Sequence, residues 1–240
     1  MLRSKEKKYL SGVEKTVLHK DLSFTAIEQY KLLRTNLAFT LPEEESCPVI
    51  GITSAVRGEG KSTTAINLAY VLAENGDKVL LIDADLRLPS IAKRLEIKNA
   101  TGLTDVLMDS EKQSISVFKS KVSENLSILP SGTLPPNPSE LIGSHRMESL
   151  LKSLKNNFDY IIVDLPPVDI VSDALAISPC ITGMIVVVRE NYTTKRDLNT
   201  CMRQLEFSHV NILGTVINQS GSEPTTYGKH YKYYKYYKKQ

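Results

Sequence analysis

A short segment of the chain has the residue types and spacing of a loop that binds phosphate. The sequence SAVRGEGKSTT runs from Ser54 to Thr64. An apolar, β-branched stretch precedes it at Val49–Thr53, and apolar side chains recur at helical spacing over Thr63–Glu74. A strand, a glycine-bearing turn and a helix in this order favour phosphate binding, because the N–H groups at a helix start attract anions.

The individual loop residues predict a nucleotide rather than a simple anion. Lys61 is expected to reach the β- and γ-phosphates, and Ser62 to offer its hydroxyl to Mg2+. We expect the nucleotide to contact residues throughout the loop: Arg57, Gly58, Glu59, Gly60, Lys61, Ser62 and Thr63. The alternative is an ordinary Gly/Ser turn before a helix. Four residues at the positions that the phosphate-binding pattern requires weigh against it: Gly58, Gly60, Lys61 and Ser62.

One loop position departs from the strict pattern. Ala55 occupies the place of the usual first glycine. A positive backbone φ is costly for alanine, so we predict that φ at this position is not positive.

Carboxylates follow two apolar stretches downstream of the loop. Asp83, Asp85 and Arg87 alternate where one stretch ends, and Asp164 closes another. Alternate residues of a strand share a face, and ligands of doubly wound sheets bind at the carboxyl ends of strands. We therefore expect these side chains to project toward the nucleotide. Taken alone, an aspartate after an apolar run could equally be a helix cap or a turn residue.

The periodicity of the chain predicts an α/β fold with a doubly wound, mostly parallel sheet covered by helices on both faces. Strands are expected at Val49–Thr53, Lys78–Ile82, Leu126–Leu129, Tyr160–Val163, Gly183–Val188 and Asn211–Ile217. Helices are expected at Thr63–Glu74, Ser139–Asn156 and Thr193–Phe207. Along the chain we predict a flexible arm (1–20), an N-terminal helical region (21–47), a single core (48–218) and a disordered tail (219–240).

The N-terminal helix is expected over residues 23–41, with one apolar face and a capping box formed by Thr25 and Glu28. Such a face usually packs on the helix's own core. Glu28, Lys31 and Arg34 would then remain outside for a partner.

Composition excludes several classes of protein. The 240 residues carry a net charge of only +3, which does not argue for a nucleic-acid partner. No apolar run approaches the roughly 20 residues that cross a bilayer. Cys47, Cys180 and Cys201 are isolated and lack a C-x-x-C spacing, which suits a reducing cytoplasm.

The C-terminal segment has an unusual composition. Six of the 11 tyrosines lie in the last 14 residues, interleaved with five lysines and no acidic residue: Tyr227, Tyr231, Tyr233, Tyr234, Tyr236 and Tyr237. Such a segment buries too little apolar surface to order itself. Residues 220–237 could span about 50–60 Å when extended, enough to reach a neighbouring subunit. Interleaved lysine and tyrosine could also bind nucleic acid, but the core shows no basic, aromatic groove that would extend such a site.

Together these features resemble the bacterial tyrosine kinases (BY-kinases), which have a MinD/ParA-like P-loop fold unrelated to that of eukaryotic kinases. The resemblance rests on GEGKST at 58–63, the strand end from Asp83 to Pro89, and DLPP at 164–167. It extends to EQYKLLRTN at 28–36, which is similar to the family's self-association helix, and to the tyrosine tail, which is similar to its autophosphorylation site.

The resemblance implies a role for each matching residue. Lys61 would contact the phosphates, Ser62 would ligate Mg2+, and Asp85 and Asp164 would act around the metal. Asp83 would be the base for the tyrosine hydroxyl. Asn218 matches the family's asparagine on the adenine side, although a simple turn asparagine is an alternative.

Two positions depart from related proteins. Lys31 replaces an arginine of the self-association helix, and lysine cannot form bidentate pairs. Val56 stands where ParA-type ATPases have a signature lysine, which argues against their ATP-sandwich dimer.

The resemblance also implies cofactors and partners. ATP and Mg2+ would be the cofactors, and ring-like self-association would bring the tail to neighbouring sites. Capsule or exopolysaccharide synthesis would be the process. A transmembrane activator of the co-polymerase type, acting through its cytoplasmic C-terminal segment, would recruit the cytoplasmic kinase to the inner face of the membrane. A cognate tyrosine phosphatase is expected, and nucleic acid is not. The alternatives are a MinD/ParA-type positioning ATPase and a non-catalytic nucleotide-binding scaffold.

Overall fold

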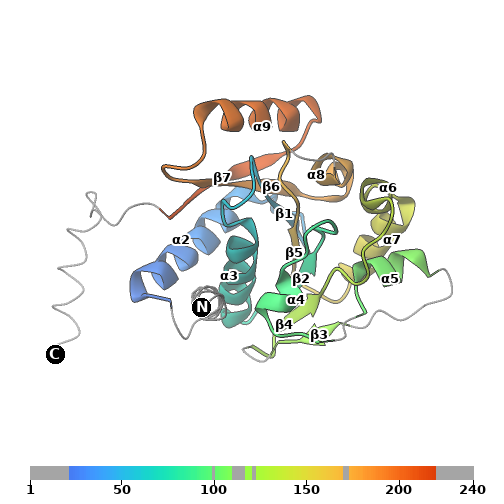
Figure 1. Cartoon of the computed structure of the whole chain (residues 1–240). Coiled ribbons are helices and arrows are strands. Elements are labelled where there is room, and N and C mark those ends of the chain that lie inside the picture. Colours follow the sequence, from blue (N-terminus) through green and yellow to red (C-terminus); the bar gives the residue numbers. More distant parts are fainter. Residues whose placement is uncertain (1–21, 99–100, 110–116, 121–122, 170–172, 220–240) are drawn as a thin grey trace, which may run out of the picture.

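The protein has one seven-stranded sheet with helices packed against both faces (Figure 1). The computed structural model describes residues 22–98, 101–109, 117–120, 123–169 and 173–219. The strand order is β3-β4-β2-β5-β1-β6-β7. Six strands run parallel, and the short edge strand β3 is antiparallel to β4. The predicted doubly wound α/β fold is confirmed.

The bounds of the strands agree closely with the sequence analysis. They are β1 Val49–Ser54, β2 Val79–Asp83, β3 Phe118–Lys119, β4 Leu126–Leu129, β5 Tyr160–Asp164, β6 Gly183–Arg189 and β7 Ile212–Asn218. The helices are α2 Phe24–Thr40, α3 Lys61–Glu74, α4 Ile91–Arg94, α5 Leu103–Met108, α6 Pro138–Ile142, α7 His145–Leu154, α8 Asp173–Ala176 and α9 Lys195–Phe207, with a 3-10 turn η1 at Ser178–Cys180. No helix in these described ranges has both the length and the apolar character needed to span a membrane.

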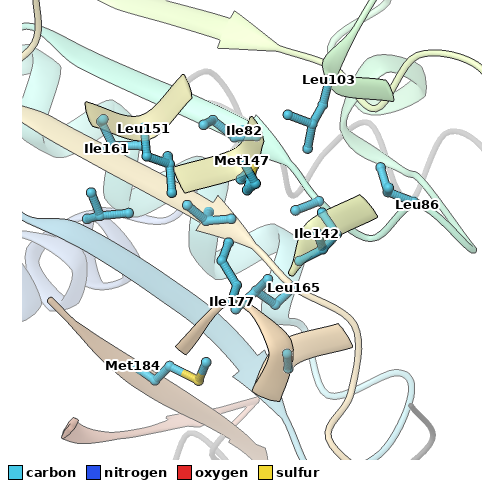
Figure 2. Close-up of a cluster of buried hydrophobic side chains, with 14 of the residues drawn as sticks. Ile82, Leu86, Leu103, Ile142, Met147, Leu151, Ile161, Leu165, Ile177 and Met184 are labelled. Carbon is cyan, nitrogen blue, oxygen red and sulfur yellow. The ribbon is translucent and has the colours of Figure 1, made fainter. Parts of the chain in front are cut away.

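Alternating strand residues build two hydrophobic layers. Leu81 and Ile162 face α2, α3 and α4 on one side of the sheet. Their neighbours Ile82 and Ile161 face the other side, where α5 to α9 pack. Figure 2 shows this second layer, in which Met147 of α7 lies close to the strand side chains. Because both faces are covered, the central strands are apolar throughout, which explains why their sequences show no polar alternation.

Two local predictions were inaccurate, and one short strand was missed. The helix expected at Ser139–Asn156 is two helices, because Gly143 ends α6 and the Ser144 hydroxyl accepts a hydrogen bond from the Met147 N–H to start α7. The N-terminal helix is capped by Ser23, whose hydroxyl accepts from the Ala26 N–H, and not by a Thr25–Glu28 box. The two-residue strand β3 is too short to leave a periodic signal.

The predicted flexible arm (1–20) and almost all of the predicted tail (219–240) lie outside the described residues. The same is true of the six tail tyrosines.

Candidate active site

The phosphate-binding loop has the backbone shape that its sequence predicts. Gly58 and Gly60 have φ angles of 81° and 97°, in the left-handed region that favours glycine. Gly60 is the N-cap of α3, so the first N–H groups of this helix open into the loop. Ala55 is absent from the residues with positive φ, which confirms the expectation for that position.

The sheet register brings the two acidic strand ends together. β5 lies between β2 and β1, and Asp83 is paired with Asp164 across the β2–β5 ladder. Asp164 is also paired with Ile52 of β1. Strand β1 ends two residues later, at Ser54, where the phosphate-binding loop begins. Strands that are far apart in sequence therefore end side by side next to the phosphate-binding loop.

Lys61 lies between the carboxylates. Its Nζ donates to Asp85 Oδ2 at 2.8 Å and lies 3.6 Å from Asp164 Oδ1. The Ser62 hydroxyl is 3.4 Å from the same ammonium. The Lys61 side chain is only 12% exposed, so these charges interact with little screening by solvent.

The electrostatics of the cluster are dominated by burial. Burial opposes the charge on Lys61, but the Asp164 and Asp85 carboxylates outweigh it, so the pKa of Lys61 is raised. Burial also raises the pKa of Asp164, and the Lys61 ammonium opposes that rise. Burial, and then the neighbouring Asp164 carboxylate, raise the pKa of Asp83 to about 7. Asp83 is thus poised to exchange a proton near neutral pH.

The two oxygens of the Asp83 carboxylate differ. Oδ2 accepts hydrogen bonds from the backbone N–H groups of Ser90 and Ile91, at 3.1 and 2.9 Å. Oδ1 is buried and has no hydrogen-bond partner. Oδ1 is therefore the oxygen that remains available to take up a proton.

The site suits a divalent cation that is held jointly with a nucleotide. Neither carboxylate oxygen of Asp164 has a hydrogen-bond partner, although the side chain is fully buried. Within the described ranges, no three Asp, Glu, His or Cys side chains are grouped to hold a metal alone. Mg2+ is commonly bound through one or two carboxylates with phosphate oxygens and water, so the Ser62 hydroxyl, Asp85 and Asp164 fit this ion.

Comparison with known proteins places this geometry in a family. The model of a family described as an AAA domain matches residues 47–213. The tyrosine-protein kinase YwqD of Bacillus subtilis strain 168 is 38% identical over 202 residues, which is 84% of each chain. The crystal structure of the chimerical protein CapA2B2 is 33% identical with a TM-score of 0.76, over 81% of this chain and 85% of that one. The chain belongs to the bacterial tyrosine-kinase family.

The family also shares its fold with positioning ATPases. The septum site-determining protein MinD of Pyrococcus horikoshii, solved with Mg-ADP, is 25% identical with a TM-score of 0.61, over 74% of this chain and 72% of that one. The bacterial tyrosine-kinase family and a MinD/ParA-like fold, both indicated by the sequence, are thus confirmed.

In this member of the family, contacts from β6 and the turn that follows it hold the phosphate-binding loop. The Glu59 side chain turns into the protein, where it accepts from the Val56 N–H at 2.8 Å and from the Thr193 hydroxyl. Arg189 donates to the Gly58 carbonyl at 3.2 Å and stacks over the Tyr192 ring. The Glu59 carboxylate therefore stabilises the loop from its buried side. Of Glu59, only the backbone remains available for the predicted contact with the nucleotide.

Asn218 closes the same side of the loop. Its amide donates to the Glu59 carbonyl at 2.8 Å, and its carbonyl oxygen accepts from the Gln219 N–H at 2.9 Å. A Cβ atom at Gly60 would lie 1.8 Å from the Asn218 amide nitrogen. Asn218 therefore packs directly on the loop, and its expected contact with adenine stays a prediction.

Replacing Gly60 with alanine should weaken both folding and nucleotide binding. Positive φ alone costs an alanine about 1–3 kcal/mol, and the clash with Asn218 adds to it. Gly76→Ala is a matched control, because Gly76 has φ 104° and nothing within 4 Å of a Cβ. Denaturant unfolding should show a larger loss for Gly60→Ala than for Gly76→Ala. Equal losses would contradict the close packing of Asn218.

Two other residues of the predicted site do not contact the carboxylate cluster. Arg87 does not project toward Lys61; its guanidinium pairs with Asp173. Arg57 is exposed at the edge of the loop. Sequence reasoning missed Arg94, which donates to the Thr63 hydroxyl at 3.3 Å, because a basic residue in a short helix carries no recognisable signal.

The predicted self-association residues divide into two groups. Glu28 and Lys31 form an exposed ion pair at 3.1 Å on α2. Arg34 donates instead to the Val71 carbonyl at 2.8 Å, in the last turn of α3. It therefore satisfies a carbonyl that lacks a helical partner, and at least one of its N–H groups is used within the chain.

Proposed function

We propose that this chain is an ATP-dependent protein-tyrosine kinase that first phosphorylates the tyrosines of its own C-terminal tail. The supporting observation is the convergence of Lys61 with Asp83, Asp85 and Asp164 beside a phosphate-binding loop. The relatives named tyrosine-protein kinases support the choice of phenol as acceptor. Phosphoryl transfer depends mainly on positioning and on stabilising charge, and this cluster supplies both.

The binding roles follow from the charges. The N–H groups at the start of α3 and the Lys61 ammonium would bind the triphosphate. Ser62, Asp85 and Asp164 would hold Mg2+, whose charge neutralises the phosphates. Upon nucleotide binding, the anionic phosphates would compete with Asp85 for Lys61, which frees the Asp85 carboxylate for its role at the metal.

Asp83 would act as the general base. Its raised pKa, about 7, matches the task of removing a proton from the tyrosine hydroxyl near neutral pH. Oδ1 would receive the proton while the Ser90 and Ile91 N–H groups fix Oδ2. Because Asp83 is fully buried, the tyrosine can reach Oδ1 only when the surrounding loops open for the substrate.

The tail would reach the site of a neighbouring subunit. The last 14 residues carry five lysines, and the site carries three carboxylates. Each phosphate adds about −1.5 to −2 charges, so a few modifications would reverse the charge of the tail and weaken its docking. Self-association through the exposed side of α2, with Glu28 and Lys31 at the contact, would arrange the subunits in a ring.

The wider setting is inferred from family likeness. A membrane activator with a cytoplasmic segment would recruit the kinase to the inner face of the membrane, and capsule or exopolysaccharide synthesis would be the regulated process. A tyrosine phosphatase would reset the tail.

Mixing two variants tests the proposed function directly. One chain carries Lys61→Met with an intact tail, and the other is active but has phenylalanine at all six tail tyrosines. With labelled ATP, Mg2+ and the activator's cytoplasmic peptide, phosphotyrosine should appear on the Lys61→Met chain only. Each variant incubated alone is the control. Release of inorganic phosphate without any phosphotyrosine would indicate a positioning ATPase, and nucleotide binding without turnover would indicate a scaffold.

A further inference from the structure

An ion pair next to the carboxylate cluster joins three separate elements. Arg87 donates from Nε to Asp173 Oδ2 at 2.9 Å and from Nη2 to Asp173 Oδ1 at 3.2 Å. The Ser139 hydroxyl accepts from Arg87 Nη2 at 3.1 Å and donates to Asp173 Oδ1. The Asp173 carboxylate is fully buried, whereas the Arg87 side chain is 41% exposed. A buried carboxylate of this kind depends on its partners, because an unpaired charge there is costly.

Arg87 lies in the loop that carries Asp85. The loop is held at its two ends, where the Ala84 N–H donates to the Asp164 carbonyl and the Ser90 N–H donates to Asp83. Asp85 itself accepts from the Leu88 N–H at 3.0 Å, so its orientation depends on the middle of the loop. Arg87 is in that middle part, and its pair with Asp173 fixes it to the rest of the protein.

Asp173 lies beyond the segment that follows Asp164, of which the structure describes residues 165–169. The first part of this segment is fixed by backbone hydrogen bonds to β1 and the phosphate-binding loop, from Leu165 to Ile52, from Val168 to Ser54 and from Asp169 to Ala55. Helix α8 begins at Asp173, where Arg87 and Ser139 bind the carboxylate. Arg87 therefore joins the loop that follows β2 to α8 and α6 at a point outside the carboxylate cluster.

We propose that Arg87, Asp173 and Ser139 form a positioning clamp that sets Asp85 relative to Asp164 and so shapes the site for Mg2+. None of the three contacts Lys61 or the cluster carboxylates through a side-chain hydrogen bond. They act through the loop that holds Asp85, which Arg87 ties to Asp173 of α8 and to Ser139 of α6. The fork of the arginine is essential, since an ammonium cannot donate to both oxygens in the same plane.

The test measures ADP affinity with and without Mg2+ for Asp173→Asn and Arg87→Lys. In both variants, the gain in ADP affinity that Mg2+ provides should fall about 10- to 100-fold, as for other residues that orient metal ligands. Affinity for ADP without Mg2+ should stay within about twofold of the original, because the phosphate-binding loop is untouched. Glu45→Gln is the control, because it breaks a partly buried ion pair with Lys155 far from the cluster.

Three outcomes would overturn the proposal. If Mg2+ raises the ADP affinity of a folded variant as much as that of the original protein, the clamp does not shape the metal site. Parallel losses of ADP affinity with and without Mg2+, together with a lower melting temperature, would indicate a structural role only. If Asp173→Asn fails to fold, Arg87→Lys decides, since it keeps the positive charge; a normal Mg2+ effect there contradicts the need for the fork.

The proposal relies on the proposed function only for its consequence in catalysis. There, kcat should fall and the KM for ATP in the presence of Mg2+ should rise, because Mg2+ adds less to nucleotide affinity. If the unmodified protein forms no phosphotyrosine, the kinase assignment fails, while the ADP and Mg2+ measurement still decides the clamp.

Discussion

Lys61→Met is expected to lower the rate of phosphotyrosine formation by about 10²–10³-fold or more, because it removes the cation that would stabilise charge on the transferring phosphate. The variant should also unfold more easily at pH 8 than at pH 6. Burial holds the pKa values of Asp83 and Asp164 above their unfolded values, and loss of the Lys61 ammonium removes a charge that opposes this rise. The folded state then binds more protons than the unfolded state, so stability falls as pH rises.

A matched control separates this effect from the loss of any lysine in an ion pair. Lys152→Met removes the exposed partner of Glu148, whose side chain lies 2.6 Å away on α7. Exposed pairs of this kind contribute little to stability, so activity and stability should hardly change. Transfer of labelled phosphate and thermal unfolding at the two pH values are the measurements. A Lys61→Met protein with more than about a tenth of the original rate would contradict the role given to this residue.

Asp83→Asn is expected to lower kcat by about 10²–10⁴-fold, the usual contribution of a general base, with little effect on ADP affinity. Asparagine keeps a carbonyl oxygen that can accept from the Ser90 and Ile91 N–H groups, so the local backbone should be retained. Asp159→Asn is the control, because Asp159 also accepts from a backbone N–H, that of Lys78, at an exposed site. Equal losses of kcat and ADP affinity would contradict the role of Asp83 as the general base.

The raised pKa of Asp83 gives two linked expectations with opposite signs. Activity should rise with pH through about 7, as the carboxyl ionises and can accept a proton. Stability without nucleotide should fall over the same range. Between the unfolded value, near 3.8, and the folded value, about 7, the folded state binds more protons, so the free energy of unfolding decreases as pH rises. Asp83→Asn removes the desolvated charge and should therefore be more stable than the original protein at pH 8.

The sequence identified the main parts of the site because their signals are local. Gly58, Gly60 and Lys61 form a pattern within a few residues, and Asp83 and Asp164 each follow a short apolar strand. The same locality explains the accuracy of the strand predictions. It also explains the error at Ser139–Asn156, where one apolar periodicity hid the break at Gly143 and Ser144.

Only the tertiary structure decided how the polar atoms are paired. The choice of Asp173 as partner of Arg87, 86 residues away, and of Thr193 as partner of Glu59, 134 residues away, depends on which loops the sheet order brings together. The single unpaired oxygen of Asp83 likewise depends on where α4 begins. The sequence by itself therefore determined which chemical groups are present and at which strand ends they lie. Folding determined which of them are neutralised, fixed or left free, because those properties arise from contacts between distant segments in a buried, weakly screened environment.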